Sequence, residues 1–209
     1  MDPMWDKDLI DQIKEAKKNV PEKFISHWEF DENNIDFASQ KDIENKKDIR
    51  FLWAAENDKI AILQELHQKY PNLINIQDSD GYSPLHRAVY NDNCEIALYL
   101  LDNGANINSL TKSNWTPLHS AVHWKHLDMV VLLIQHGADV NAKTSSNVTP
   151  IHLACSSDNR EIIECLLLQE GIDLDVKSNS GDYPIDLCKR HNRYSFLFDM
   201  HNHNVQSII

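Results

Sequence analysis

The amino-acid sequence predicts an all-α fold, a solenoid of stacked helical repeats over residues 48–200. Four of the seven prolines, from Pro84 to Pro184, recur at intervals of 33 or 34 residues. Each of them opens a similar line, of which Thr-Pro-Leu-His at 116–119 is one example. A Leu-rich stretch and then a glycine follow three of these lines. A period near 33 residues is typical of an array in which each repeat packs on its neighbours.

Each repeat is expected to begin with a short helix whose first residue is the proline. Proline fixes φ at a position where the backbone N–H has no partner, and the Ser or Thr before it can cap the helix. Ala88, Ala121 and Ala154 recur at one position of this helix, on the face predicted to point inward. Because alanine is small, neighbouring first helices can approach closely there.

A second helix is predicted to follow in each repeat, with an apolar stripe such as Val130, Leu133 and Ile134. Glycines at 104, 137 and 171 come after these stripes, where a helix commonly ends on a left-handed residue. A hairpin-like loop then leads to the next proline.

The array is expected to have irregular ends. The segment from Asp48 aligns with a first helix but lacks the proline line, so we predict Asp48 as its N-cap and a second helix over 59–69. At the other end, residues 183–200 supply a first helix and a few apolar residues without a further repeat. The prediction is about four repeats plus a partial C-terminal cap, followed by a tail at 201–209.

The repeat line resembles the ankyrin repeat family, whose consensus runs from G-x-T-P-L-H-x-A-A to L-L-x-x-G-A-D-V-N. Residues 133–141, L-I-Q-H-G-A-D-V-N, match that consensus almost letter for letter. The resemblance implies helix-turn-helix-hairpin units and a concave surface that binds proteins. Asn114 and Asn147 stand where the family has a turn glycine, which asparagine can replace because it adopts positive φ more readily than most residues.

The first 47 residues have a different composition, with 12 acids, 8 bases and no repeat signal. We expect this segment to be mostly disordered apart from a short helix near 7–19, because it has little apolar surface to offset the entropy of ordering. Two alternatives stay open: the segment is a solvated tether, or its aromatic residues dock on the stack or on a partner.

Charge and composition exclude several classes of function. The formal net charge of −12 argues against direct binding of nucleic acid, which needs clustered Lys and Arg. The longest purely apolar run, at 129–134, is far too short to cross a membrane. The N-terminus has no apolar signal core, and the four cysteines form no C-x-x-C pair, so reduced thiols are expected. A chain of 24.2 kDa without an export signal can enter both cytoplasm and nucleus, and we expect it to be a monomer in both.

Catalytic and metal sites find little support in the sequence. His119, His123 and His126 have a spacing that zinc could use if they lay on one helix. The resemblance instead implies that His119 is the motif histidine and that His126 lies in the turn between helices. No nucleophile elbow or phosphate-binding glycine loop is present, so we predict no cofactor, no metal and no enzymatic activity.

The family's contact positions place a binding face on the hairpin tips and on the solvent side of the first helices. Tyr82, Tyr90, Trp115, His123 and Trp124 fall on one concave strip, and such aromatic residues dominate interface hot spots. The alternative is that these rings only pack on neighbouring repeats. The complete set of predicted contact residues is Asp80, Tyr82, Tyr90, Asn91, Lys112, Ser113, Trp115, His123, Trp124, Ser145, Ser146 and Val148, with Ser156 and Ser157 beyond them.

Two functions follow from the resemblance. Strings such as G-Y-S-P-L-H-R-A-V-Y at 81–90 are similar to one subgroup of the family, which implies a nuclear positive regulator of gene expression linked to differentiation and spermatogenesis. The other hypothesis is a regulatory substrate that sequesters an asparaginyl hydroxylase. Asn141 follows Asp-Val and lies eight residues after Leu133, as that enzyme prefers, whereas Asn108 follows Asn-Ile and should be the poorer substrate. Structural capping of the turn by Asn141 is the competing interpretation.

Overall fold

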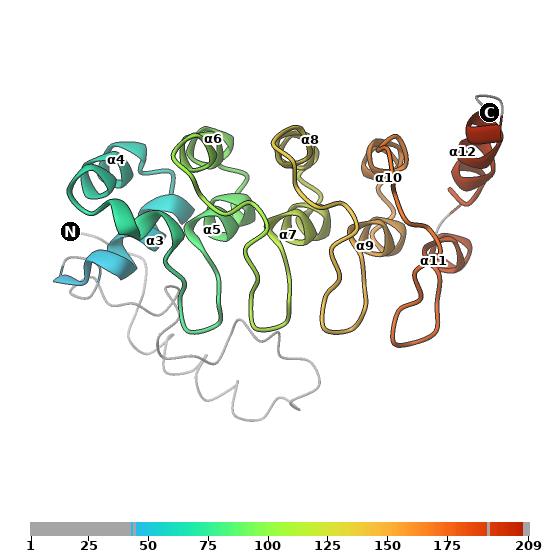
Figure 1. Ribbon diagram of the computed structural model, residues 1–209, viewed down its shortest axis with the longest axis horizontal. Helices are drawn as coiled ribbons and strands as arrows, with labels where there is room; N and C mark the ends of the chain where they lie inside the picture. The colour runs from blue at the N-terminus through green and yellow to red at the C-terminus, as the bar shows by residue number, and fades with distance from the viewer. Residues whose placement is uncertain (1–42, 44, 192, 207–209) are drawn as a thin grey trace, which may run out of the picture.

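The structure is a computed structural model that describes residues 43, 45–191 and 193–206. Within these residues the chain is helical and contains no strand. Figure 1 shows two rows of helices, with long loops that project from the inner row. The inner row contains α3 (Lys47–Glu56), α5 (Pro84–Tyr90), α7 (Pro117–Trp124), α9 (Pro150–Ser156) and α11 (Pro184–His191). The outer row contains α4 (Ile60–Lys69), α6 (Cys94–Asp102), α8 (Leu127–Gln135), α10 (Arg160–Leu167) and α12 (Phe196–Gln206), and a short 3-10 helix, η4 (Pro71–Asn75), follows α4.

The predicted helix starts are confirmed at the proline lines. Thr116 has an extended backbone, and its hydroxyl accepts a hydrogen bond from the backbone N–H of His119. The His119 ring in turn lies within hydrogen-bonding distance of the Thr116 backbone N–H, which completes a reciprocal cap. Pro117 then occupies the first helical position, where its missing N–H costs nothing.

The core runs without interruption along the whole stack. Ala88, Ala121 and Ala154 are fully buried, as predicted, and each inner helix packs on the next. Leu100 and Leu133 from the outer row are also fully buried. Because each internal repeat shares its apolar surface with two neighbours and each terminal unit with one, the core belongs to the array rather than to a single unit.

Left-handed residues turn the chain at the positions the sequence indicates. Gly104, Gly137 and Gly171 all have positive φ after the second helices. Asn114 and Asn147, with φ of 58° and 57°, adopt the conformation of the glycine they replace. These turns bring every hairpin back to the same edge of the stack (Figure 1).

The ends of the array differ in detail from the sequence-based expectations. Asp48 is not the N-cap of α3: Lys46 holds that position without a side-chain cap, and Asp48 lies in the first turn, where its carboxylate is stabilised by the helix dipole. At the C-terminal end α12 continues to Gln206, so the boundary expected between 200 and 201 lies inside a helix. The predicted helix near 7–19 and the predicted disorder of the N-terminal segment lie outside the described residues. Among the described helices none is long and apolar enough to span a bilayer.

Candidate protein-binding face

The hairpin tips are held in a row by backbone hydrogen bonds between successive repeats. The Lys112 N–H donates to the Asp80 carbonyl at 2.9 Å, and the Ser145 N–H donates to the Ser113 carbonyl at 3.0 Å. A third bond of the same kind joins Asn179 to Ser146. Four tips are therefore fixed relative to one another, which gives the row of tips a defined spacing.

A ladder of buried histidines fixes the base of each hairpin. The Ser83 backbone N–H donates to Nδ1 of His86, so the neutral ring carries its proton on Nε2. That Nε2 lies 3.1 Å from the carbonyl of Trp115 in the following hairpin. His119 and His152 make the equivalent contacts one and two repeats later. Burial lowers the pKa of both His86 and His119 to about 4, so both rings are neutral near pH 7.

Asparagines form a second ladder, on the loops that follow the outer helices. The Asn141 side chain donates to the Gly171 carbonyl at 2.8 Å and accepts from the Asp173 N–H at 2.8 Å. Asn75 makes the same pair of bonds two repeats earlier, and Asn108, one repeat earlier, accepts from the Asp139 N–H. Both ends of the Asn141 amide therefore stabilise the next loop, as the capping interpretation expects.

Four of the five residues of the predicted aromatic strip form a continuous cluster across two repeats. The Trp124 ring lies edge-on to Tyr90, with centroids 4.9 Å apart, and edge-on to His123 at 5.0 Å. His123 in turn meets Trp115 at 5.3 Å. We call Tyr90, Trp115, His123 and Trp124 the aromatic cluster. Trp124 is 39% exposed, and burial beside the indoles lowers the pKa of His123. The cluster thus packs on itself and still presents aromatic surface to solvent.

Tyr82 lies in a different environment from the aromatic cluster. It is half-buried, edge-on to His86, and its ring lies 5.4 Å from the guanidinium carbon of Arg87. Burial raises its pKa. Tyr82 therefore stabilises the first hairpin.

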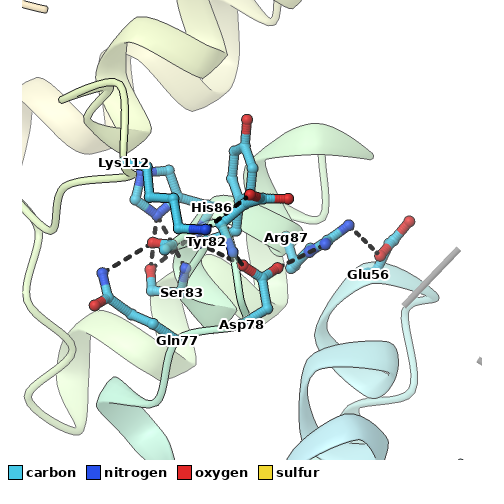
Figure 2. A network of polar contacts seen from close by, with 10 residues as sticks. Glu56, Gln77, Asp78, Tyr82, Ser83, His86, Arg87 and Lys112 are labelled. Carbon is cyan, nitrogen blue, oxygen red and sulfur yellow. Dashed lines mark hydrogen bonds and ion pairs between the residues drawn. The ribbon is translucent and has the colours of Figure 1, made fainter. Parts of the chain in front are cut away.

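Arg87, which the sequence did not single out, connects this hairpin to the preceding unit. Its guanidinium forms ion pairs with Asp78 at 2.7 Å and with Glu56 at 3.2 Å, and the side chain is 2% exposed (Figure 2). Asp78 also accepts hydrogen bonds from the backbone N–H groups of Asp80 and Tyr82. One buried cation thus fixes the shape of the first tip.

The remaining predicted contact residues are divided between exposed and structural positions. Lys112 is exposed and pairs with Asp80 at 3.5 Å, a surface ion pair of little energetic weight. Asn91 donates to the Glu56 carbonyl at 2.8 Å, so its amide serves the stack. Ser113, Ser145, Ser146 and Ser156 are exposed, whereas Val148 and Ser157 are half-buried.

The comparisons with known proteins agree with this architecture. A family model for ankyrin repeats (3 copies) matches residues 32–111, 51–144 and 109–178. The chain belongs to the ankyrin repeat family. Its repeats form a protein-interaction module of a family that is typically non-catalytic.

Curated relatives of this ankyrin repeat chain include ankyrin repeat domain-containing protein 49 from several animals. The Drosophila melanogaster protein is 34% identical over 102 residues, 48% of this chain and 46% of the relative. The Bos taurus protein is 35% identical over 72 residues, 34% and 30% of the two chains, and the Homo sapiens protein is 33% identical over the same length and shares. The matched region spans less than half of each of these relatives.

The three histidines with zinc-like spacing do not converge in the ankyrin stack. Nε2 of His119 lies 3.1 Å from the Val148 carbonyl, and Nε2 of His126 lies 3.1 Å from the Tyr90 carbonyl. His123 belongs to the aromatic cluster. In the described part of the chain no group of three His, Cys, Asp or Glu residues is placed to hold a metal ion.

Proposed function

We propose that this protein binds a protein partner through the aromatic cluster on the concave face of its ankyrin stack. The observation that carries this proposal is the 39% exposure of Trp124 within a cluster whose other rings hold it in place. Trp and Tyr supply large contact areas at a small cost in side-chain entropy, and they dominate interface hot spots. A preorganised aromatic surface is therefore suited to anchor a partner.

The row of hairpin tips supports the same proposal. Ser113, Ser145 and Ser146 are exposed at the hairpin tips, and the tips are spaced by backbone bonds rather than by mobile side chains. A polar rim around an aromatic centre is the usual composition of a protein–protein interface. The alternative, that the rings serve only repeat packing, explains their mutual contacts but leaves the solvent-facing part of Trp124 without a role.

The biological setting is part of the proposal. By similarity to ankyrin repeat domain-containing protein 49, we propose a nuclear positive regulator of gene expression in differentiation and spermatogenesis, present in nucleus and cytoplasm. The chain acts as a monomer that contacts proteins and not nucleic acid. Strict exclusion of the tagged full chain from the nucleus would argue against this role while leaving the binding face untouched.

The decisive experiment compares two double variants of the full chain. Trp115→Ala with Trp124→Ala should leave far-UV circular dichroism nearly unchanged and weaken capture of partners at least tenfold, about 1.4 kcal/mol. The matched control is Leu98→Ala with Leu168→Ala, because those side chains are 42% and 80% exposed but lie at or just after outer helices. Affinity mass spectrometry should show proteins lost with the first variant and retained with the second. Equal capture by both variants would refute the proposal, and unfolding of the first would show that the indoles are core.

A second candidate function is a regulatory substrate of an asparaginyl hydroxylase, modified at Asn141. Asn141 belongs to a surface loop, but its amide bonds to Gly171 and Asp173 must open before an enzyme can reach it. Peptide mass spectrometry of the chain from cells should show a mass gain of one oxygen on Asn141 above that on Asn108. Modification of Asn108 alone would contradict the preference for the Asp-Val context.

A further inference from the structure

The C-terminal end of the stack contains a basic hollow that neither the fold nor the aromatic cluster explains. It has a volume of about 630 Å³. Arg160 and Asp158 line it from the start of α10 and the turn before it, whereas Arg190, Arg193 and Tyr194 line it from the end of α11 and just beyond. His191 completes the lining. We call this site the arginine hollow.

The concentration of arginine at this place is unusual for this chain. The sequence contains five arginines and carries a formal net charge of −12, yet three of the five line the arginine hollow. Basic residues in the last turn of α11 stabilise its dipole, which accounts for Arg190 and His191. That helix effect does not account for Arg160 or Arg193, which lie outside α11.

Two of the three guanidinium groups form exposed ion pairs, which a ligand can displace. Arg190 pairs with Asp182 at 2.6 Å and Arg160 pairs with Glu164 at 2.7 Å, but both arginines are more than half exposed. Exposed pairs of this kind are worth little and exchange readily. For Arg193 the described residues include no carboxylate within ion-pair distance. The six lining residues thus carry three guanidiniums and one carboxylate, Asp158.

The arginine hollow continues the row of side chains that contains the aromatic cluster. Counted from the repeat proline, Arg190 occupies the position of Tyr90, His123 and Ser156 in the earlier repeats. His191 occupies the position of Trp124. Since α7 packs on α9 and α9 packs on α11, the hollow lies two helix spacings, about 20 Å, from the indole of the cluster. An extended segment of about six residues spans that distance.

We propose that the arginine hollow binds the phosphate of a phosphorylated side chain in the protein partner. This inference rests on the proposed function, because the same partner crosses the aromatic cluster. The six lining residues carry a formal charge of +2, and they match the dianion of a phosphate monoester once Arg190 and Arg160 exchange the carboxylates of Asp182 and Glu164 for its oxygens. One guanidinium can donate two parallel hydrogen bonds to the oxygens of a phosphate. Three guanidiniums from two neighbouring repeats can therefore surround one phosphate.

Other anionic partners fit the molecule less well. A polynucleotide or an anionic bilayer is itself negatively charged over a wide area, so a chain with net charge −12 would repel it. A single phosphate at one end of the face experiences mainly the local arginines, because charges beyond about 10 Å are screened at physiological salt. A carboxylate side chain carries only half the charge that the lining can match.

Phenyl phosphate, added to the isotope-labelled full chain, tests the proposal directly. The Nε–Hε signals of Arg160, Arg190 and Arg193 should shift together with a dissociation constant in the millimolar range, about −4 kcal/mol. The Arg50 signal serves as internal reference, because that residue lies on α3. Succinate, a dianion of carboxylates, should bind at least about fivefold more weakly. Equal binding of succinate, or no shift of the three signals, would overturn the assignment.

Two single substitutions give opposite expected effects. Arg193→Gln removes a positive charge without breaking an ion pair of the described chain. It should weaken the binding of phenyl phosphate at least about fivefold. Asp158→Asn removes the only carboxylate of the lining and should strengthen the binding of phenyl phosphate about threefold. Arg50→Gln is the matched control and should change nothing. If Asp158→Asn weakens binding or Arg193→Gln leaves it unchanged, the phosphate does not occupy the hollow.

Two further measurements distinguish a phosphopeptide in the arginine hollow from other ligands and from a failure of the aromatic cluster. The Trp115→Ala, Trp124→Ala chain should bind phenyl phosphate normally, so failure of the aromatic cluster and failure of the arginine hollow are distinguishable. Phosphatidylserine vesicles should not sediment the chain at physiological salt. Sedimentation that Arg193→Gln abolishes would replace the phosphopeptide with a lipid headgroup as the occupant.

Discussion

The guanidinium of Arg87 on α5 forms a 3.2 Å ion pair with Glu56 at the end of α3, and both side chains are almost completely removed from solvent. The same guanidinium contacts Asp78 in the first hairpin at 2.7 Å. One side chain therefore ties the N-terminal unit, the first full repeat and its hairpin together. A buried cation is stable only while its partners are present.

Replacing Arg87 should destabilise the stack strongly. Arg87→Met keeps much of the side-chain volume but leaves two buried carboxylates without their cation, and we expect a loss of about 3–5 kcal/mol in the free energy of unfolding. Urea unfolding followed by circular dichroism measures this loss. Arg190→Met, which breaks an exposed pair with Asp182, should cost less than about 1 kcal/mol. Similar costs for the two variants would contradict the buried network.

Stability should fall as the pH drops from about 6.5 to about 4. Burial lowers the pKa of His86 and His119 to about 4 in the folded chain, whereas the unfolded chain has the ordinary value near 6.5. Between these pH values the unfolded state binds more protons than the folded state. Each histidine therefore lowers the free energy of unfolding by up to about 3 kcal/mol. Urea midpoints at pH 7, 6 and 5 measure the slope.

A histidine substitution isolates the origin of that slope. His119→Gln should lower stability at pH 7, because it loses the bond to the Val148 carbonyl, and should also flatten the pH dependence. His136→Gln serves as control, since His136 is exposed. An unchanged slope in the His119 variant would show that other groups cause the acid sensitivity.

Two glycines with the same backbone conformation should respond differently to alanine. Gly81 and Gly104 have φ of +87° and +86°, so alanine costs about 1 kcal/mol of backbone strain at either. A Cβ at Gly81 would lie 3.0 Å from Cα of Thr111 in the next hairpin, whereas a Cβ at Gly104 meets nothing within 4 Å. Gly81→Ala should therefore be more destabilising by about 1–2 kcal/mol, measured by thermal unfolding. Equal melting temperatures would mean that the hairpins separate freely.

The four cysteines should divide into two reactivity classes. Cys155 and Cys188 are fully buried neighbours in α9 and α11, and burial raises the pKa of the Cys155 thiol. Cys94 and Cys165 are half-buried, and burial raises the pKa of their thiols as well, so accessibility rather than acidity separates the two classes. Iodoacetamide followed by intact mass spectrometry should add two adducts quickly in buffer and four in guanidinium chloride. Early labelling of Cys188 would indicate that α11 opens from the end of the stack.

Local, periodic signals made most of the fold predictable from the sequence. The prolines mark helix starts because their φ and missing N–H act within one turn, and Asn114 and Asn147 could be assigned to left-handed turns for the same local reason. Asp48 was wrongly assigned as a cap because the first unit lacks a proline line and its start depends on Lys46 instead. The extent of α12 could not be predicted, since no repeat follows it to set a boundary.

The sequence by itself determined the repeat length, the helix pairs, the buried alanines and the row of candidate contact residues, because each depends on residues a few positions apart. Only the tertiary structure decided that Arg87 is buried between Glu56 and Asp78, that Trp124 meets Tyr90 edge-on, and that three arginines share one hollow. These relationships join residues of different repeats, often about thirty positions apart. Such contacts depend on how the repeats stack, and no local pattern of residue types encodes that geometry.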